Sequence, residues 1–244
     1  MSKVIVITGG GAGLGRVVAQ RLAADGETLV LLGRTQAKVE AVAAELGGSV
    51  MAVQCDVASP DSVRSAFAAI AARHPKIDVL INNAAIYEPF EVVDATDAQI
   101  LDHILINLAG PIFCIRSAVP MMEAGGHIIN VSSESVEIPF AMLSLYQATK
   151  AGLERFSRAM ELEFEPKGIR VTTVRAGQMM GDIKDWARSP VALTFHQACL
   201  ARGLDLRERG ITQMESVPGI FRAVIDLPAD LQIGTVTLHA RKAG

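Results

Sequence analysis

The strongest indication of the fold is the stretch Thr8-Gly9-Gly10-Gly11-Ala12-Gly13-Leu14-Gly15, which joins an apolar run to an amphipathic one. Val4–Ile7 before it is typical of a buried strand, and Val17, Val18 and Leu22 after it share one face of a helix. Glycines in a strand-to-helix turn let the backbone approach a pyrophosphate, and the N-terminus of the helix offers free N–H groups. In this context the turn predicts dinucleotide binding, although a purely structural turn also uses glycine. The cofactor contacts expected in the turn are Gly9, Gly11, Gly13, Leu14 and Gly15.

Outward from the turn, short β-branched runs alternate with longer Ala-rich helical patterns. Strands are predicted near residues 3–8, 28–33, 49–55, 77–82, 126–132, 169–175 and 233–239. Helices are predicted near 13–25, 36–46, 60–73, 97–122 and 145–165. Strands separated by helices of this length form a parallel sheet that is covered on both faces. We therefore expect an α/β fold: one domain over residues 1–244, with a Rossmann-type doubly wound parallel sheet of about seven strands and helices on both faces.

The alternation of predicted strands and helices is interrupted once, over residues 176–215, which contain glycines, Pro190 and charged clusters and no predicted strand. A long irregular segment in a compact domain is usually a functional loop or a disordered one. This segment follows the carboxyl end of a strand, where open α/β sheets bind ligands. The segment is therefore a candidate part of the functional site.

The composition excludes several classes of protein. Half of the 244 residues are hydrophobic, only 5% are aromatic, and the net charge is −3. This apolar surplus excludes a disordered chain, and the balanced charge does not favour nucleic-acid binding. Apolar runs such as Ile128–Val131 are far shorter than the ~20 residues of a spanning helix, and the N-terminus lacks a secretory pattern. Cys55, Cys114 and Cys199 are expected to be reduced core thiols, no metal site is expected, and a cytoplasmic location follows.

The second strand supplies evidence on which dinucleotide is bound. An acidic residue about twenty positions beyond the glycine turn would bind the adenosine ribose of NAD. Here the strand ends in Leu32-Gly33-Arg34-Thr35, without an acid. The guanidinium of Arg34 suits a 2′-phosphate, with Thr35 and Lys38 as helpers, so NADP(H) is favoured over NAD(H). The other interpretation is that Arg34 is simply a solvated residue at the end of a strand.

Further motifs follow in order along nearly the whole chain. They are Asp56-Val57 after the third strand, Asn82-Asn83-Ala84-Ala85, Asn107 in Asn-Leu-Ala-Gly-Pro, Ser133, and Tyr146-Gln147-Ala148-Thr149-Lys150. Together with the glycine turn, this set resembles the short-chain dehydrogenases/reductases. The resemblance implies adenine contacts from Asp56 and Val57, cofactor contacts from Asn83, Ala84, Tyr146, Lys150 and Gly177, and a catalytic set of Asn107, Ser133, Tyr146 and Lys150. Taken alone, Asn107 and Asp56 also fit caps or turns.

Reduction of a carbonyl by hydride transfer needs a proton donor, and the reverse reaction needs a base. A free tyrosine has a pKa of about 10 and is a poor base at neutral pH. Tyr146 and Lys150 are four residues apart on a predicted helix, so they share one face, and an ammonium there is expected to lower the phenol pKa. Ser133, at a strand's carboxyl end, can donate a hydrogen bond to the substrate oxygen. By resemblance, Lys150 also holds the nicotinamide ribose and Asn107 positions a water.

The resemblance also implies a substrate lid over residues 178–215. Two interpretations are open for the large apolar residues of this segment, which are Met179, Met180, Trp186 and Phe195. They either line an apolar pocket, with Met179 as a substrate contact, or simply pack the loop against the rest of the domain. Binding of an acidic substrate tail is one role open to Arg188, Arg202, Arg207 and Arg209, but they are expected to be solvated charges. The chain departs from the family where Ala176 replaces a proline before Gly177 and where Gly181 stands in place of a threonine, so the anchoring of the nicotinamide must differ.

The predicted helices 97–122 and 145–165 are apolar on more than one face. In the family such helices form dimer interfaces, so a homodimer or homotetramer is expected. The resulting hypothesis is an NADP(H)-dependent carbonyl reductase or dehydrogenase that interconverts a ketone or aldehyde with an alcohol, with Tyr146 as acid/base. Ser133 and Tyr146 would contact this small-molecule substrate. The alternative is a non-catalytic dinucleotide-binding sensor or scaffold with the same fold, which retention of the whole catalytic set disfavours.

Overall fold

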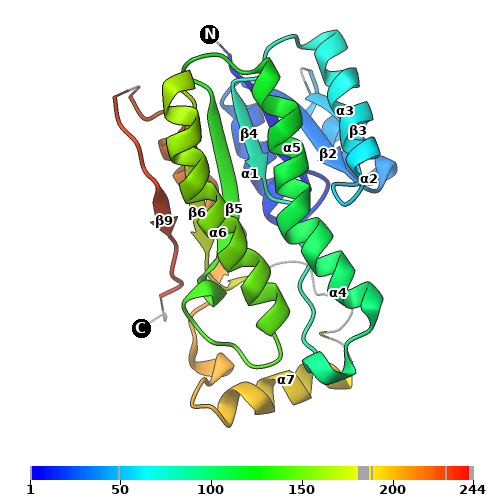
Figure 1. Cartoon of the computed structure of the whole chain (residues 1–244), viewed down its shortest axis with the longest axis vertical. Helices are drawn as coiled ribbons and strands as arrows, with labels where there is room; N and C mark the ends of the chain where they lie inside the picture. The colour runs from blue at the N-terminus through cyan, green and yellow to red at the C-terminus, as the bar shows by residue number, and fades with distance from the viewer. Residues whose placement is uncertain (1, 49, 181–186, 188, 229, 242–244) are drawn as a thin grey trace.

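Seven parallel strands form the centre of the molecule in the computed structural model, which describes residues 2–48, 50–180, 187, 189–228 and 230–241. The strands are β1 (Val4–Thr8), β2 (Thr28–Gly33), β3 (Val50–Gln54), β4 (Val79–Asn82), β5 (His127–Ser133), β6 (Arg170–Ala176) and β9 (Thr235–Thr237). Their order is β3-β2-β1-β4-β5-β6-β9 (Figure 1). The direction of winding reverses between β1 and β4, which confirms the predicted doubly wound parallel sheet.

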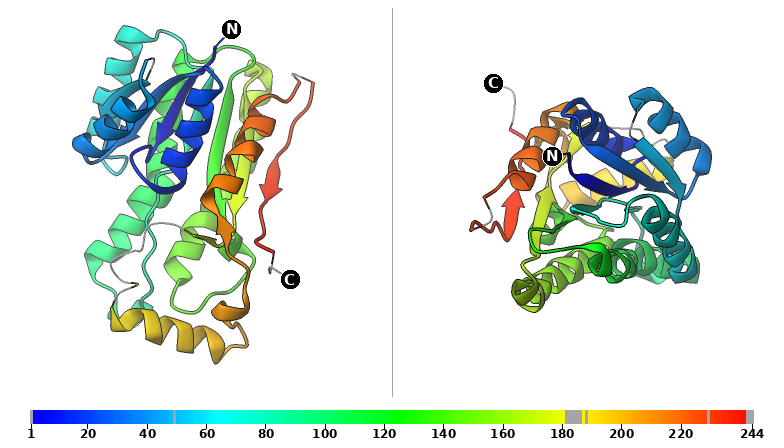
Figure 2. Two further views of the ribbon diagram at one scale, coloured as in Figure 1. Left: turned by 180° about the vertical axis from the view of Figure 1, so that it is seen from behind. Right: turned by 90° about the horizontal axis from the view of Figure 1, so that it is seen from above.

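Helices cover both faces of the sheet. One face carries α3 (Pro60–Arg73), α5 (Gly110–Ala118) and α6 (Ser144–Phe164), and the other carries α1 (Gly13–Ala24), α2 (Gln36–Leu46) and α8 (Pro218–Ile225), as Figure 2 shows from behind and above. Helix α8 was not among the predicted helices, and it packs against α1. Short 3₁₀ turns complete this part: η1 (Val92–Asp94), η4 (Glu134–Val136), η5 (Glu165–Lys167) and η8 (Met214–Ser216).

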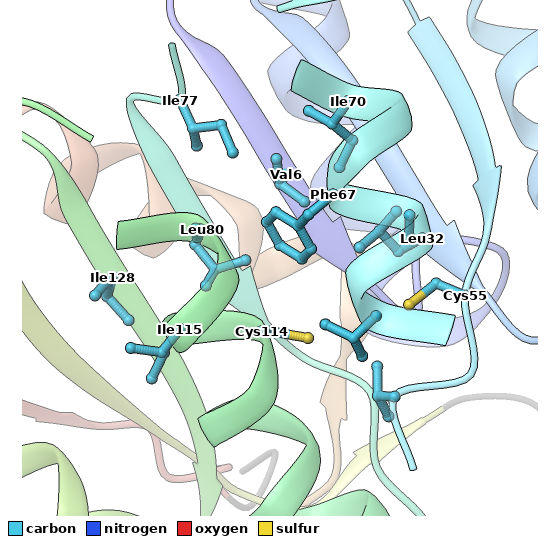
Figure 3. Close-up of a cluster of buried hydrophobic side chains, with 14 of the residues drawn as sticks. Val6, Leu32, Cys55, Phe67, Ile70, Ile77, Leu80, Cys114, Ile115 and Ile128 are labelled. Atoms are coloured by element: carbon cyan, nitrogen blue, oxygen red, sulfur yellow. The ribbon is translucent and has the colours of Figure 1, made fainter. Parts of the chain in front are cut away.

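The core is split into two layers by the sheet itself. Alternate residues of a strand point to opposite faces, so Ile5 and Ile7 enter one cluster while Val6 enters the other. Figure 3 shows the second layer, where Phe67 of α3 packs with Leu80 and neighbouring side chains. Because both faces are covered, the central strands β1, β2 and β4 are almost wholly apolar, which explains part of the hydrophobic composition. The thiols Cys55, Cys114 and Cys199 are free and buried, as expected.

The predicted helix 97–122 is not regular. It consists of α4 (Asp97–Ile104), a π-helical turn η2 (Leu105–Ala109), α5 and the 3₁₀ turn η3 (Val119–Met121). This combined run, Asp97–Met121, is long and apolar enough to cross a membrane by length and composition, which the lengths of the separate apolar runs did not indicate. In the structure it packs against α3, α6 and β4, as a core helix does.

The segment 176–215 contains more structure than expected. The expectation that it holds no strand was wrong: β7 (Met179–Met180) pairs in parallel with β8 (Thr212–Gln213). Helix α7 (Pro190–Leu200) and the turn η7 (Leu206–Glu208) lie between them, and α7 crosses beyond the carboxyl ends of the strands in Figures 1 and 2. Phe195 and Cys199 anchor α7 by packing with Ala141 and Leu143. Gly181, Trp186 and Arg188 lie outside the described residues.

Candidate functional site

The glycine turn is held against β4 by hydrogen bonds. Oγ1 of Thr8 accepts from the backbone N–H groups of Asn83 and Ala84, each at 3.0 Å. A Cβ at Gly15 would lie 2.4 Å from the carbonyl oxygen of Gly9 and 2.6 Å from Nδ2 of Asn83, so only glycine fits there. At the N-terminus of α1, the capping residue Ala12 has no side-chain acceptor. The first N–H groups of α1 therefore face the turn without a side-chain cap, the arrangement that binds a phosphate.

One large cavity of about 1010 Å³ extends from this turn along the carboxyl edge of the sheet. The predicted site residues that line it are Gly9, Gly13, Leu14, Arg34, Asp56, Val57, Asn83, Ala84, Ser133, Tyr146, Gly177 and Met179. Four predicted site residues are not in its lining: Gly11, Gly15, Asn107 and Lys150. The fold thus gathers residues from the whole length of the chain at one cavity, since parallel strands end at the same edge.

Tyr146 of α6 and Ser133 at the end of β5 face this cavity together. Burial raises the pKa of Tyr146 to about 12, while a hydrogen bond with the Ser133 side chain acts in the opposite direction. The ring of Tyr87 packs against that of Tyr146, with centroids 5.7 Å apart. The expected lowering of the Tyr146 pKa by Lys150 is not found. Nζ of Lys150 donates to the carbonyl of Val131 at 2.8 Å.

Lys150 lies one helical turn beyond Tyr146 and is buried. Its Nζ is 5.9 Å from the centroid of the Tyr146 ring. Burial lowers the pKa of Lys150 to about 8, and the carboxylate of Glu154 acts in the opposite direction. The amine therefore gains and loses its proton close to neutral pH, within reach of the phenol.

Asn107 sits in the π-helical turn and is fully buried. Its Nδ2 donates to the carbonyl of Ile86 at 2.8 Å, and its Oδ1 accepts from the Ile86 N–H at 2.9 Å. Ile86 lines the cavity. The structure thus shows Asn107 fixing the segment after β4, and π-helical turns of this kind are frequent at functional sites.

A partly buried ion pair lies beside the site and connects α6 to β6. Arg175 of β6 donates to both carboxylate oxygens of Glu154 on α6, at 3.0 and 2.7 Å. Ser132, next to Ser133, donates to the same carboxylate at 2.6 Å, and Glu137 also pairs with Arg175. These bonds raise the pKa of Arg175. The helix that carries Tyr146 is thereby tied to the two strands beside it.

Gly177, directly after β6, packs closely against the C-terminal segment. A Cβ there would lie 2.5 Å from the carbonyl oxygen of Leu238, so the C-terminal segment passes too close for any larger residue. The N–H of Leu238 bonds the carbonyl of Arg175 at 2.9 Å, which extends the pairing beyond β9. Gly177 lines the cavity on its other side.

Sequence reasoning missed Glu134, which follows Ser133 directly, lines the cavity and is buried. Its Oε2 lies 2.7 Å from Nη2 of Arg209 and 3.7 Å from Nδ1 of His239. The Arg209 guanidinium also lies 5.4 Å from the centre of the Phe140 ring. The expectation that Arg209 is a solvated charge was therefore wrong, because its partner is far away in the sequence. An acidic residue right after a cavity serine was the one available signal.

Comparison with known proteins agrees with this arrangement. Residues 3–190 match the model of the family described as short chain dehydrogenase. The chain belongs to the short-chain dehydrogenase/reductase family of oxidoreductases. It is 34% identical to a D-xylose 1-dehydrogenase of Caulobacter vibrioides, over 72% of each chain. It is 30% identical to a 3-oxoacyl-[acyl-carrier-protein] reductase of Bos taurus, over 96% of this chain and 99% of that one.

Solved structures show the same fold. L-sorbose reductase from Gluconobacter frateurii, complexed with NADPH and L-sorbose, is 25% identical with a TM-score of 0.85, covering 98% of this chain and 95% of that one. The closed form of serine dehydrogenase complexed with NADP+ is 26% identical with a TM-score of 0.84, covering 96% and 94%. The Rossmann-type sheet predicted above is the fold of these neighbours.

Proposed function

We propose that the protein interconverts a ketone or aldehyde with its alcohol, with NADP(H) as the hydride carrier. The observation that carries this proposal is the shared cavity: the glycine turn, Ser133 and Tyr146 all line it. The residues present fit a dinucleotide, since the N-terminus of α1 lacks a side-chain cap and opens on the turn. When bound, NADP(H) supplies or accepts the hydride. The residues of the chain itself bind the substrate, orient it and transfer the proton.

The proton is assigned to Tyr146. With a pKa of about 12 its phenol is protonated at neutral pH and can give a proton to the substrate oxygen during reduction. Ser133 donates a hydrogen bond to the same oxygen, where negative charge develops. Lys150, one helical turn beyond Tyr146, is proposed to hold the nicotinamide ribose, and Asn107 in the π-helical turn is proposed to position a water for the proton relay. The non-catalytic alternative has no support among the relatives.

Tyr146→Phe tests the assignment, because it removes the proton donor and keeps the ring that packs on Tyr87. We expect turnover with carbonyl substrates to fall by at least about 100-fold, the contribution of a positioned acid, with the NADPH dissociation constant changed less than about threefold. The measurements are NADPH oxidation against a panel of ketones and aldehydes, and a fluorescence titration of NADPH. Turnover equal to that of the unsubstituted enzyme would reject Tyr146 as the donor.

Arg34 is the residue proposed to select NADP(H). It is exposed, lines the cavity at the end of β2, and has no carboxylate beside it in Leu32-Gly33-Arg34-Thr35. Two solved neighbours hold NADPH and NADP+, which supports the choice. Thr35 and the exposed Lys38 are the proposed helpers.

Arg34→Ala is expected to weaken NADPH binding about 10-fold or more, the worth of a charge-assisted contact, and to leave NADH binding nearly unchanged. Titrations with both nucleotides measure the two dissociation constants. Equal weakening of both would contradict a contact with the 2′-phosphate, and Arg16→Ala, on the outer side of α1 and paired with Glu45, serves as the control.

We further propose that residues 1–244 act as one catalytic domain located in the cytoplasm, with residues 178–215 as the substrate lid. Met179 and Phe195 from that segment line the cavity, which supports a role in substrate contact. Assembly into a homodimer or homotetramer belongs to the same proposal. It is supported by apolar side chains exposed on α4 and α6, where Leu101 is 54% and Leu162 is 75% exposed.

A further inference from the structure

Residues 206–214, the return segment, lead from α7 back towards the sheet (Figure 2). At one end of this segment, Leu206 packs with the apolar cluster to which Tyr146 also belongs. At the other end, Cε of Met214 lies 3.9 Å from the position of a Cβ built at Gly13 in the glycine turn. Four residues of the segment line the cavity: Leu206, Arg207, Ile211 and Met214. The return segment is therefore a wall of the cavity that extends from the proposed proton donor to the glycine turn.

The two ends of the return segment are held by contacts that its middle lacks. Strand β8 pairs with β7, and the N–H of Thr212 donates to the carbonyl of Gln178 at 3.0 Å. Packing holds the other end, at Leu206. In the described part of the chain, the backbone of residues 209–211 has no hydrogen bond to another residue. The position of the middle therefore depends on side chains.

Arg209 supplies the polar contacts of this middle part. Its Nη2 lies 2.7 Å from Oε2 of Glu134, and the two side chains are only 23% and 5% exposed, so solvent screens the pair weakly. The guanidinium also lies 5.4 Å from the centre of the Phe140 ring, which attracts a cation. The carbonyl of Phe140 accepts a hydrogen bond from Nε2 of Gln147, the neighbour of Tyr146, at 2.6 Å. Arg209 thus contacts two residues that line the cavity.

Glu134 is a fixed partner for Arg209 because its own backbone is held. It directly follows Ser133 and begins the 3₁₀ turn η4. Its carbonyl accepts from the N–H groups of Glu137 and Ile138, each at 3.0 Å. The N–H of Ser135 donates to Oγ of Ser133 at 3.2 Å, which joins the turn to the proposed reaction centre. A bond to Glu134 therefore fixes the return segment relative to Ser133.

We propose that Arg209 is a positioning residue, whose contacts with Glu134 and Phe140 hold the middle of the return segment in place as a wall for the carbonyl substrate. This inference rests on the proposed function, which places the substrate at Ser133 and Tyr146. A wall that is ordered before binding spares the substrate the entropic cost of ordering it. NADP(H) depends less on Arg209, because the pairing of β8 with β7 holds the Met214 end.

Arg209→Met tests the proposal, because it removes the charge and keeps a long apolar side chain near Phe140. The probe is the carbonyl compound of the panel above that the unsubstituted enzyme reduces fastest. We expect its KM to rise about 10-fold, with kcat and the NADPH dissociation constant changed less than about threefold, since the proton donor lies outside the segment. Arg209→Lys, which keeps the charge, should raise KM by less than about threefold.

A double variant shows whether Glu134 and Arg209 act through the same contact. Glu134→Gln added to Arg209→Met should raise KM no further than Arg209→Met does alone, because the pair is already broken. Two independent effects would multiply. Multiplied effects would therefore overturn the inference.

Hydrogen exchange followed by mass spectrometry tests the position of the segment without turnover. Local opening speeds the exchange of the backbone amides that it exposes. Peptides from residues 206–214 should exchange faster in Arg209→Met than in the unsubstituted protein or in Arg209→Lys. Peptides from β5 and β6 should exchange equally in all three, which separates loss of this contact from a general loss of stability.

Arg202→Met is the matched control. Arg202 is an exposed cation near the end of α7, donates to the carbonyl of Ala198 and is not in the cavity lining. Its KM and exchange should equal those of the unsubstituted protein. An unchanged KM or unchanged exchange in Arg209→Met would overturn the inference and leave the proposed function standing. If the unsubstituted protein reduced no carbonyl, the proposed function would be overturned, and the exchange would still decide whether Arg209 holds the segment.

Discussion

At two positions of this site, the distance to neighbouring backbone atoms restricts which amino acid can be present. Gly15 and Gly177 are required because a Cβ at either position would meet a backbone oxygen at 2.4 or 2.5 Å. The first requirement follows from a local turn, and the glycine pattern predicts it. The second comes from Leu238, which reaches Gly177 only through the pairing of β6 with β9. Both glycines were expected as cofactor contacts, but only the structure shows that Gly177 also has a packing role.

His127 makes the stability of the fold dependent on pH. It is buried at the start of β5 and shares a hydrogen bond of 2.8 Å with Oγ1 of Thr172. Burial, helped by the charge of Arg170, lowers its pKa from 6.5 to about 3. Between pH 6.5 and about 3, His127 is protonated in the unfolded chain but neutral in the folded chain. The free energy of unfolding is therefore highest above pH 6.5 and decreases as the pH falls towards 3.

We expect the free energy of unfolding to decrease by about 1.4 kcal/mol per pH unit from this group alone over that window. Urea denaturation at a series of pH values measures it. His127→Gln, which removes the titrating ring and keeps a polar side chain near Thr172, should give a flatter profile. Parallel profiles for the two proteins would show that His127 does not contribute.

Secondary-structure elements are joined at the site by Glu154 and Arg175, whose side chains are only 14% and 12% exposed. The pair connects α6, which carries Tyr146 and Lys150, to β6, and Ser132 of β5 donates to the same Glu154 carboxylate. Sequence reasoning identified both elements but not this connection, because a charged residue on a helix is usually solvated. The break in the helical run around Asn107 was also missed, although Gly110-Pro111 directly follows the π-helical turn and Pro111 has no N–H to donate to the carbonyl of Asn107.

Glu154→Ala is expected to lower the free energy of unfolding by about 3 kcal/mol, because it leaves the Arg175 charge buried with less compensation. Chemical denaturation measures the change. Glu137→Ala, at the exposed end of the same network, is the control and should cost less than about 1 kcal/mol. Similar decreases in the free energy of unfolding for the two variants would mean that burial of the Glu154–Arg175 pair does not contribute to stability.

At the scale of the whole molecule, the exposed apolar residues of α4 and α6 predict self-association. Leu101 and Ile104 on α4 are 54% and 37% exposed, although α4 is otherwise amphipathic. We expect light scattering to give a mass of two or four chains, and Leu101→Glu with Leu162→Glu to shift it towards one chain. A monomeric mass for the unsubstituted protein at micromolar concentration would contradict the prediction.

The amino-acid sequence was enough to predict the seven strands of the main sheet, the helices up to residue 165, the parallel sheet and the glycine turn, but not β7, β8, α7 or α8. These features depend on local periodicity and on the backbone conformations that glycine permits, so they can be recognised in short windows. It also indicated which residues meet at the carboxyl edge, because parallel strands must end together. Their surroundings became visible in the folded chain alone: the ion pair of Glu134 with Arg209, the close approach of Leu238 to Gly177, and the helix α7, whose Phe195 lines the cavity. These contacts join residues that are far apart in the chain, so they cannot be predicted from patterns in short stretches of sequence.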